Sequence, residues 1–199
     1  SSAASDVYKR QYNTNTTIYT GMITGYNIEG GTGVAGGNAQ TNITNLMLIV
    51  TTDNTIHEVA LRLFARCMMY GNPDKDNNYI SAQHFRELNN SVPADVKALI
   101  NRNSESATYA NLKAYEKPSQ DNYLFGLLNY HTYFGLNNIT SRLKVMQINH
   151  SDIIDIGYSA NDAGIAYNTL DILNEVFARQ YQQLRFGETN NVIKFFERE

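Results

Sequence analysis

The densest group of potentially catalytic side chains lies late in the chain. His150, Asp152, Asp155 and Asp162 together offer an imidazole and carboxylates, which is the composition of a metal site or of an acid and base pair. The expected local structure separates them. His150 and Asp152 fall in a turn, Asp155 projects from the polar face of a strand, and Asn161 or Asp162 caps the helix that follows. Because these positions do not converge, we predict structural roles for them.

Two other segments carry part of a ligand-binding motif. Residues 30–38, GGTGVAGGN, are rich in glycine, but no Lys follows as in a phosphate-binding loop, and the spacing differs from the dinucleotide fingerprint. Residues 71–79, GNPDKDNNY, place Asp74 and Asp76 at alternating positions, but the Gly and Glu of an EF-hand are missing at the required offsets. The sequence therefore predicts a flexible connector for the first segment and a structural loop for the second.

The candidate nucleophiles and bases are isolated from one another. His57 and Glu58 are neighbours, but adjacent residues on a helix point about 100° apart, so we expect His57 to be solvated. Cys67 is the single cysteine and can form neither an internal disulfide nor a metal cage. The patterns G-x-S-x-G and H-E-x-x-H are absent. We therefore predict that the protein is not an enzyme and uses no cofactor or metal.

Tyrosine is the most frequent aromatic residue, with 14 Tyr, 8 Phe and no Trp. Four aromatic residues cluster after Lys117-Pro118: Tyr123, Tyr130, Tyr133 and Phe134. Tyrosine rings stack on sugar faces, and they also fill cores and interfaces while keeping a hydrogen-bonding group. Packing is the preferred interpretation, and sugar contact is the alternative.

Composition limits the class of protein. A chain of 199 residues with 42% hydrophobic content is long enough for one domain with a substantial core. The net charge is −3 and the basic residues form no run, which argues against nucleic acid as the main partner. The longest apolar run, residues 46–50, is far shorter than the roughly 20 residues of a membrane helix. Residues 1–11 share no pattern with the rest, and we interpret them as a non-native or disordered leader.

The expected elements define an α+β fold. Residues 16–28 alternate as a strand, and residues 42–70 carry two helical patterns that meet near residues 51–54, where Thr52 or Asp53 can cap. Short helices follow. Residues 143–158 alternate as a hairpin. We predict a small, mainly antiparallel sheet formed by the early strand and the late hairpin, with helices packed on one face.

A long amphipathic helix follows the hairpin. Its predicted packing positions are Ile165, Leu170, Leu173, Phe177 and Tyr181. The opposite side, expected to face water, carries Asn168, Asp171, Glu175, Arg179 and Gln182. We predict a break at Phe186-Gly187 and a second helix that is cut off at Glu199, so that the domain spans residues 12–186 and residues 187–199 begin a truncated, protruding helix. Exposure alone suggests contacts between protomers at Gln182, Arg185, Glu188 and Asn190.

Three runs carry a family resemblance. They are NLMLIVTTDNTIHEVALRLFARCM, SRLKVMQINHSDIIDIGY and SDIIDIGYSANDAGIAYNTLDILNEVFARQYQQLRFGETNNVIKFFE. The sequence resembles the chain-length determinant (Wzz-type) polysaccharide co-polymerases, above all the Bacteroides-type exopolysaccharide proteins, over most of residues 12–199. Many relatives have Pro where Ala163 stands, and Pro at a first helical position is replaceable.

The resemblance implies a non-catalytic scaffold. Such proteins are anchored in the bacterial inner membrane by two flanking helices, with this part in the periplasm, and they assemble as homo-oligomers. They act with a polysaccharide polymerase or export machinery on a growing glycan, and so set the length of an O-antigen, capsule or exopolysaccharide. A glycan-binding or sensor module outside the cytoplasm is the alternative.

Overall fold

The computed structural model describes the backbone of residues 10–21 and 35–196, and the side chains of residues 10–21 and 40–182. Predictions for residues 1–9, for residues 22–28 of the expected first strand and for residues 30–34 therefore lie outside the described residues. Within the described part the protein is α+β, as predicted, with a three-stranded antiparallel sheet and helices packed against it.

The sheet pairs a strand near the start of the chain with a hairpin late in the chain. Its strands are β1 (Tyr12–Tyr19), β2 (Leu143–Gln147) and β3 (Ile153–Ala160), in the order β1-β3-β2. Thr16, Ile156 and Val145 lie opposite one another across the three strands. The predicted hairpin is confirmed, and its turn places Asn149 and His150 at positive φ. Strand β1 begins at Tyr12 rather than at the predicted Thr16, because its polar first half also pairs with β3.

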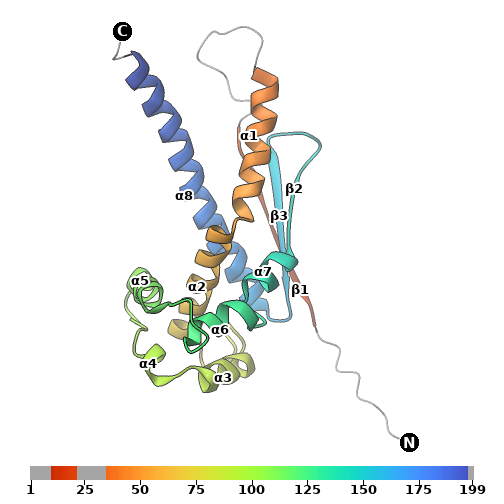
Figure 1. The fold of residues 1–199 in the computed structure, drawn as a ribbon. Coiled ribbons are helices and arrows are strands. Elements are labelled where there is room, and N and C mark those ends of the chain that lie inside the picture. The colour runs from red at the N-terminus through yellow and green to blue at the C-terminus, as the bar shows by residue number, and fades with distance from the viewer. Residues whose placement is uncertain (1–9, 22–34, 197–199) are drawn as a thin grey trace, which may run out of the picture.

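Eight helices occur in the described residues (Figure 1). They are α1 (Ala35–Val50), α2 (Asp53–Tyr70), α3 (Ala82–Ser91), α4 (Ala94–Lys97), α5 (Glu105–Tyr115), α6 (Tyr123–Tyr130), α7 (Leu136–Arg142) and α8 (Ala163–Phe196). Helices α3 to α6 form a lobe at one end of the molecule, which we call the helical lobe. Helix α1, the hairpin turn and the second half of α8 project at the opposite end.

Helix α2 is the centre of the core. Its residues are buried on nearly all sides because α8, α5 and α7 pack around it. Phe64 is fully buried and its ring meets Phe134 edge to face at 5.5 Å. Thr52 caps the helix as predicted, with its hydroxyl accepting a hydrogen bond from the Thr55 backbone.

Two predicted boundaries are wrong. Helix α8 runs without a break from Ala163 to Phe196, through Phe186-Gly187. One glycine costs a helix only about 1 kcal/mol relative to alanine, and strong helix formers such as Gln182 and Arg185 precede it. Helix α1 begins at Ala35, inside the segment predicted to be a connector. The glycines there occupy the first helical turn, where the backbone N–H groups have no helical partner in any case.

Candidate functional site

The carboxylate of Asp162 joins three parts of the fold. It caps α8 as predicted, with Oδ1 accepting a hydrogen bond from the Ile165 backbone at 3.2 Å. Its Oδ2 accepts a hydrogen bond from the Ser81 backbone at 2.9 Å and lies 2.7 Å from Nδ1 of His84. The Asp162 side chain is only 1% exposed. Asp162 therefore fastens the end of the sheet to the start of the helical lobe.

The Ser81, His84 and Asp162 side chains have the composition of a hydrolase triad but not its geometry. In a triad the hydroxyl and the carboxylate bind opposite nitrogens of the imidazole. Here Ser81 Oγ, at 2.9 Å, and Asp162 Oδ2, at 2.7 Å, both approach Nδ1 of His84. Ser81 Oγ also accepts a hydrogen bond from the His84 backbone as the N-cap of α3. The cluster can hold two elements together, but it cannot activate the serine.

Hydrogen bonding keeps Asp162 ionised. Burial alone would raise the pKa of its carboxyl, but the hydrogen bonds from His84, Ser81 and the Ile165 backbone outweigh burial, and the pKa is lowered. A general acid or base at neutral pH needs a pKa close to that pH. The pKa of Asp162 is lowered and so lies further from neutral pH than that of an ordinary aspartate, which favours a structural role.

The second polar cluster is an ion-pair ladder between α2 and α8. Glu58 pairs with Arg179 at 2.6 Å, Arg62 pairs with Glu175, and Arg66 pairs with Asp171 at 2.6 Å. The ladder residues step by four along α2 and by four in reverse along α8, so the helices run antiparallel. Glu105, at the start of α5, also accepts hydrogen bonds from both of the ladder arginines on α2.

The ladder adds a charged partner to the side of α8 that is predicted to face water. Asp171, Glu175 and Arg179 pair with α2, and Asn168 is buried, with its amide donating to Asn78 O at 2.7 Å. Glu175, Arg179 and Gln182 are exposed, as predicted, so the prediction is wrong only for the buried Asn168. The spacing of the polar residues predicts contact with water but not the pairing with α2, although a charged partner helix fits the same spacing.

The charges of the ladder are fixed. Burial opposes the charged form of Arg66, but hydrogen bonds to Asp171, Glu105 and Glu175 more than compensate and raise its pKa. Burial likewise opposes ionisation of Glu175, and hydrogen bonds from Arg62 and Arg66 lower its pKa. These groups stay ionised over the physiological range, so they position helices and do not transfer protons.

Two side chains considered for chemistry have structural surroundings. His57 is half-buried rather than fully solvated, which differs from the prediction: its Nε2 lies 2.7 Å from Glu116 Oε1, next to the end of α5. Cys67 is fully buried, and burial raises the pKa of its thiol far above the ordinary value, so the reactive thiolate does not form.

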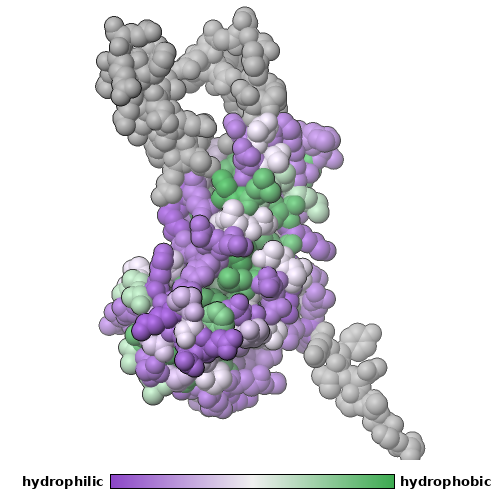
Figure 2. All heavy atoms as spheres, viewed as in Figure 1, coloured by the Kyte–Doolittle hydropathy of each residue, from purple (hydrophilic) through white to green (hydrophobic). Residues whose placement is uncertain are grey.

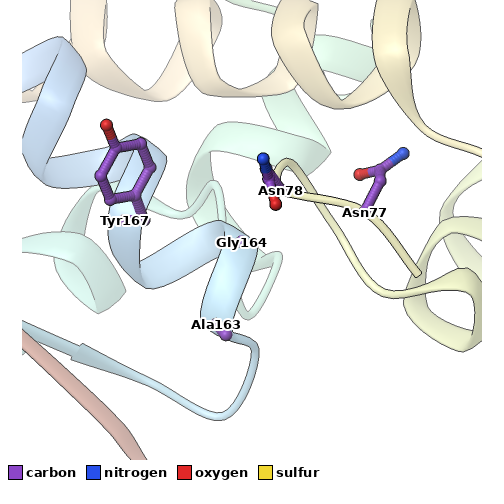
Figure 3. A pocket seen from close by; sticks show the side chains of 5 residues that line it. All are labelled: Asn77, Asn78, Ala163, Gly164 and Tyr167. Carbon is purple, nitrogen blue, oxygen red and sulfur yellow. The ribbon is translucent and has the colours of Figure 1, made fainter.

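The start of α8 and the loop before α3 border a hollow of about 350 Å³ (Figure 3). Tyr167 stands on one side and Asn78 on the other, while Asn77 points away from Tyr167. The Asn77 side chain accepts hydrogen bonds from the backbones of Tyr79 and Ile80 and donates to Tyr70 O, so it folds the loop. This fits the prediction of a structural loop for residues 71–79.

Gly164 allows the loop to approach α8. A Cβ at Gly164 would lie 2.4 Å from Tyr79 C and 2.6 Å from Ile80 N, which are backbone atoms. Gly164→Ala is therefore expected to lower the free energy of unfolding by about 1–3 kcal/mol, the usual cost of overpacking. Urea unfolding measures the change. The control is Gly126→Ala in α6, where a Cβ would meet no atom within 4 Å, and which should not destabilise the protein.

The predicted packing residues of α8 lie inside the protein. Ile165, Leu170, Leu173 and Phe177 are buried, and Tyr181 is half-buried, with its hydroxyl donating to Thr20 O at 2.7 Å. The predicted inter-protomer contacts are only partly described. Gln182 is exposed, and the side chains of Arg185, Glu188 and Asn190 lie outside the described residues.

The four aromatic residues considered for sugar contact divide into two pairs. Tyr133 and Phe134 are buried, at 6% and 0% exposure, which agrees with the preferred interpretation of packing and not with the alternative of sugar contact. Tyr130 is 75% exposed and Tyr123 is half-buried, and both line a hollow beside α6. The sequence spacing alone could not separate the pairs, because α6 ends at Tyr130 and the chain turns inward after His131.

The described side chains include no group of three or more His, Cys, Asp or Glu that could hold a metal ion. A search of the same residues finds no helix with the length and hydrophobicity to cross a membrane. In comparisons with known proteins, no family model, no curated protein and no solved structure matches the chain.

Proposed function

We propose that this chain is the extracytoplasmic domain of a non-catalytic, oligomeric scaffold that controls the chain length or export of a bacterial surface polysaccharide. The observation that carries the proposal is the shape of α8. This helix of 34 residues leaves the sheet, pairs with α2 and then continues past the start of α2 as an arm (Figure 1). An arm of this kind offers a lateral surface on which copies of one chain can meet.

The end of the molecule that carries the arm also exposes hydrophobic surface. Hydrophobic residues gather over α1, beside α8 (Figure 2). Leu48 in α1 is 59% exposed, while Leu46 and Val50 on the same helix are buried. Exposed apolar surface beside a projecting helix is typical of an interaction surface. We assign the contacts between protomers to α1 and α8.

The polar clusters support a scaffold more than an enzyme. The carboxylate of Asp162 binds His84, and those of Asp171 and Glu175 bind the buried Arg66, so these groups hold helices in place. A domain whose helices are held together in this way can keep a fixed orientation relative to the neighbouring copies in an oligomer. The mechanism proposed is therefore assembly, with the oligomer acting on a polymerase, an export machinery or the growing glycan.

Deleting the gene of the full-length protein is expected to change the length distribution of the surface glycan without abolishing sugar linkage, as seen on a polysaccharide gel. Leu48→Glu should leave the domain folded but reduce the size of the oligomer in membrane extracts and shift the glycan lengths in the same direction as the deletion. Tyr167→Glu is the matched control, because Tyr167 is also 59% exposed but lies at the other end of the domain. An unchanged length distribution in the deletion strain would contradict the scaffold function.

A further inference from the structure

One face of α6 carries a slot between two tyrosines. Tyr123, Gly126 and Tyr130 lie three and four residues apart, so they share one side of the helix. They border an open hollow of about 570 Å³ between α6, the end of α3 and the segment before α6. The residues that line it also include Ser91, Pro93, Gln120, Asp121, Asn122 and His131.

The fold itself does not require glycine at position 126. A Cβ there would meet no atom within 4 Å, whereas a Cβ at Gly71 or Gly164 would meet backbone atoms within 2.6 Å. Glycine inside a helix costs about 0.5–1 kcal/mol relative to alanine. The absent side chain does, however, leave the floor of the slot open between the two rings.

The two walls of the slot differ in rigidity. The Tyr123 ring lies 6.5 Å from the ring of Phe64 in the core, and its hydroxyl is 3.3 Å from Ser91 Oγ, so this wall is held in place. Tyr130 is 75% exposed, which is the largest exposure among the large hydrophobic and aromatic side chains of the described residues. A ligand that covers the Tyr130 ring would bury this surface, and the fixed Tyr123 lowers the entropy cost of binding.

The rim of the slot carries neutral donors and acceptors with one carboxylate. Nδ1 of His131 accepts a hydrogen bond from the Tyr133 backbone at 3.1 Å, and burial lowers the pKa of the imidazole. His131 is therefore neutral at pH 7, with its proton on Nε2, which can act as a donor. Ser91, Gln120 and Asp121 add a hydroxyl, an amide and a carboxylate.

This chemistry selects among ligand classes. None of the described side chains that line the slot is Lys or Arg, so a phosphate or another anion would find no cation there. The polar rim disfavours a purely apolar ligand. Sugar rings present apolar C–H faces, which aromatic rings can cover, and hydroxyl groups around their edges, which need mixed donors and acceptors.

We propose that the slot on α6 binds one or two rings of a neutral oligosaccharide, with a ring seated over Gly126 between Tyr123 and Tyr130. The proposal goes beyond the scaffold function and does not depend on it, because the slot belongs to the helical lobe, away from α1 and the projecting part of α8 (Figure 1). A single shallow site of this kind binds weakly, and we expect a Kd in the millimolar range.

Three variants test the slot. Tyr130→Ala removes the exposed wall and is expected to weaken binding by about fivefold to tenfold, which corresponds to the loss of about 1–1.4 kcal/mol from one stacked aromatic contact. Gly126→Leu fills the floor and should abolish binding without lowering stability, because open space surrounds the Cβ and leucine favours the helix. Tyr167→Ala is the matched control: this exposed tyrosine lies on α8, outside the slot, and its loss should leave binding unchanged.

The probes are neutral tri- and tetrasaccharides of glucose, galactose, mannose and N-acetylglucosamine, with tripolyphosphate as the anionic comparison. Binding is followed by NMR, as shifts of the ring resonances of Tyr123 and Tyr130. The proposal predicts that at least one neutral oligosaccharide shifts them at millimolar concentration and that Gly126→Leu removes the effect. It is overturned if none of the sugars shifts these rings, if only tripolyphosphate does, or if Gly126→Leu binds as the unaltered chain does. A changed glycan length distribution in the deletion strain alongside such a negative result would leave the scaffold function intact.

Discussion

Arg66→Ala is expected to lower the free energy of unfolding by about 1.5–3 kcal/mol, the usual contribution of a hydrogen bond to a charged group. Breaking a fully buried ion pair costs more, but Asp171 and Glu175 are 41% and 44% exposed and can be solvated. Arg66 donates to Glu105 at 2.9 Å, to Asp171 at 2.6 Å and to Glu175 at 2.6 Å. Its side chain is only 9% exposed. Without it, three carboxylates from two helices face one remaining arginine, Arg62, and repel each other. Urea unfolding followed by circular dichroism measures the loss.

The same ladder contains its own control. Arg179 pairs with Glu58 at 2.6 Å, but the Arg179 side chain is 47% exposed, and pairs at the surface contribute at most about 1 kcal/mol. Arg179→Ala should therefore cost much less than Arg66→Ala. Equal losses for the two variants would show that burial does not set the strength of these pairs. A loss below about 1 kcal/mol for Arg66→Ala would contradict the structural role assigned to the buried cluster.

The ion-pair ladder could have been predicted from the sequence, because charged residues repeat with the same spacing on both helices. Glu58, Arg62 and Arg66 repeat every four residues on one helix, and Asp171, Glu175 and Arg179 repeat every four residues on another in the complementary order. Such a pattern predicts an antiparallel pair of helices as well as it predicts a face in water. What the sequence could not supply was Glu105, because nothing in the local pattern of α5 indicates which helix its first residue meets.

Local signals predicted the elements better than the contacts between them. The alternation of Val145 and Ile156 with polar neighbours predicted the hairpin, because a strand buried on one face leaves a period of two. The chemistry of helix starts predicted a cap at Thr52 or Asp53 and another at Asn161 or Asp162, and in the structure the caps are Thr52 and Asp162. The predicted break at Phe186-Gly187 was wrong, because a single glycine ends a helix only where the surrounding residues do not favour it.

The sequence predicted the segment that carries the candidate slot, but not which of its residues form the slot. The Tyr-rich segment suggested sugar contact, but exposure, which separates Tyr130 from Tyr133, depends on how α6 and the following turn pack on α2. The meaning of Gly126 was not visible at all. A glycine that makes room for a neighbour and a glycine that leaves an open slot look identical until the surrounding atoms are placed.

Asp162→Ala is expected to lower the free energy of unfolding by about 2–4 kcal/mol. The variant loses the N-cap of α8, which is worth about 1 kcal/mol. It also leaves the partly buried N–H of Ser81 without its acceptor, which costs about 1–3 kcal/mol. Asp76→Ala is the matched control, because Asp76 accepts a hydrogen bond from the Ala82 backbone at 2.8 Å but is exposed. The control should cost less than about 1 kcal/mol, since water can replace its carboxylate.

The loss caused by Asp162→Ala should depend on pH with a defined sign. The pKa of Asp162 is lowered in the folded protein, so the unfolded state binds its proton more readily. The stability that this ionisation contributes is therefore fully present above the ordinary pKa of an aspartate and is lost as the pH falls through the lowered pKa. Urea unfolding at a series of pH values should show the difference between the two proteins shrinking in acid. A difference that stays constant would mean that Asp162 acts through its shape and hydrogen bonds, and not through its charge.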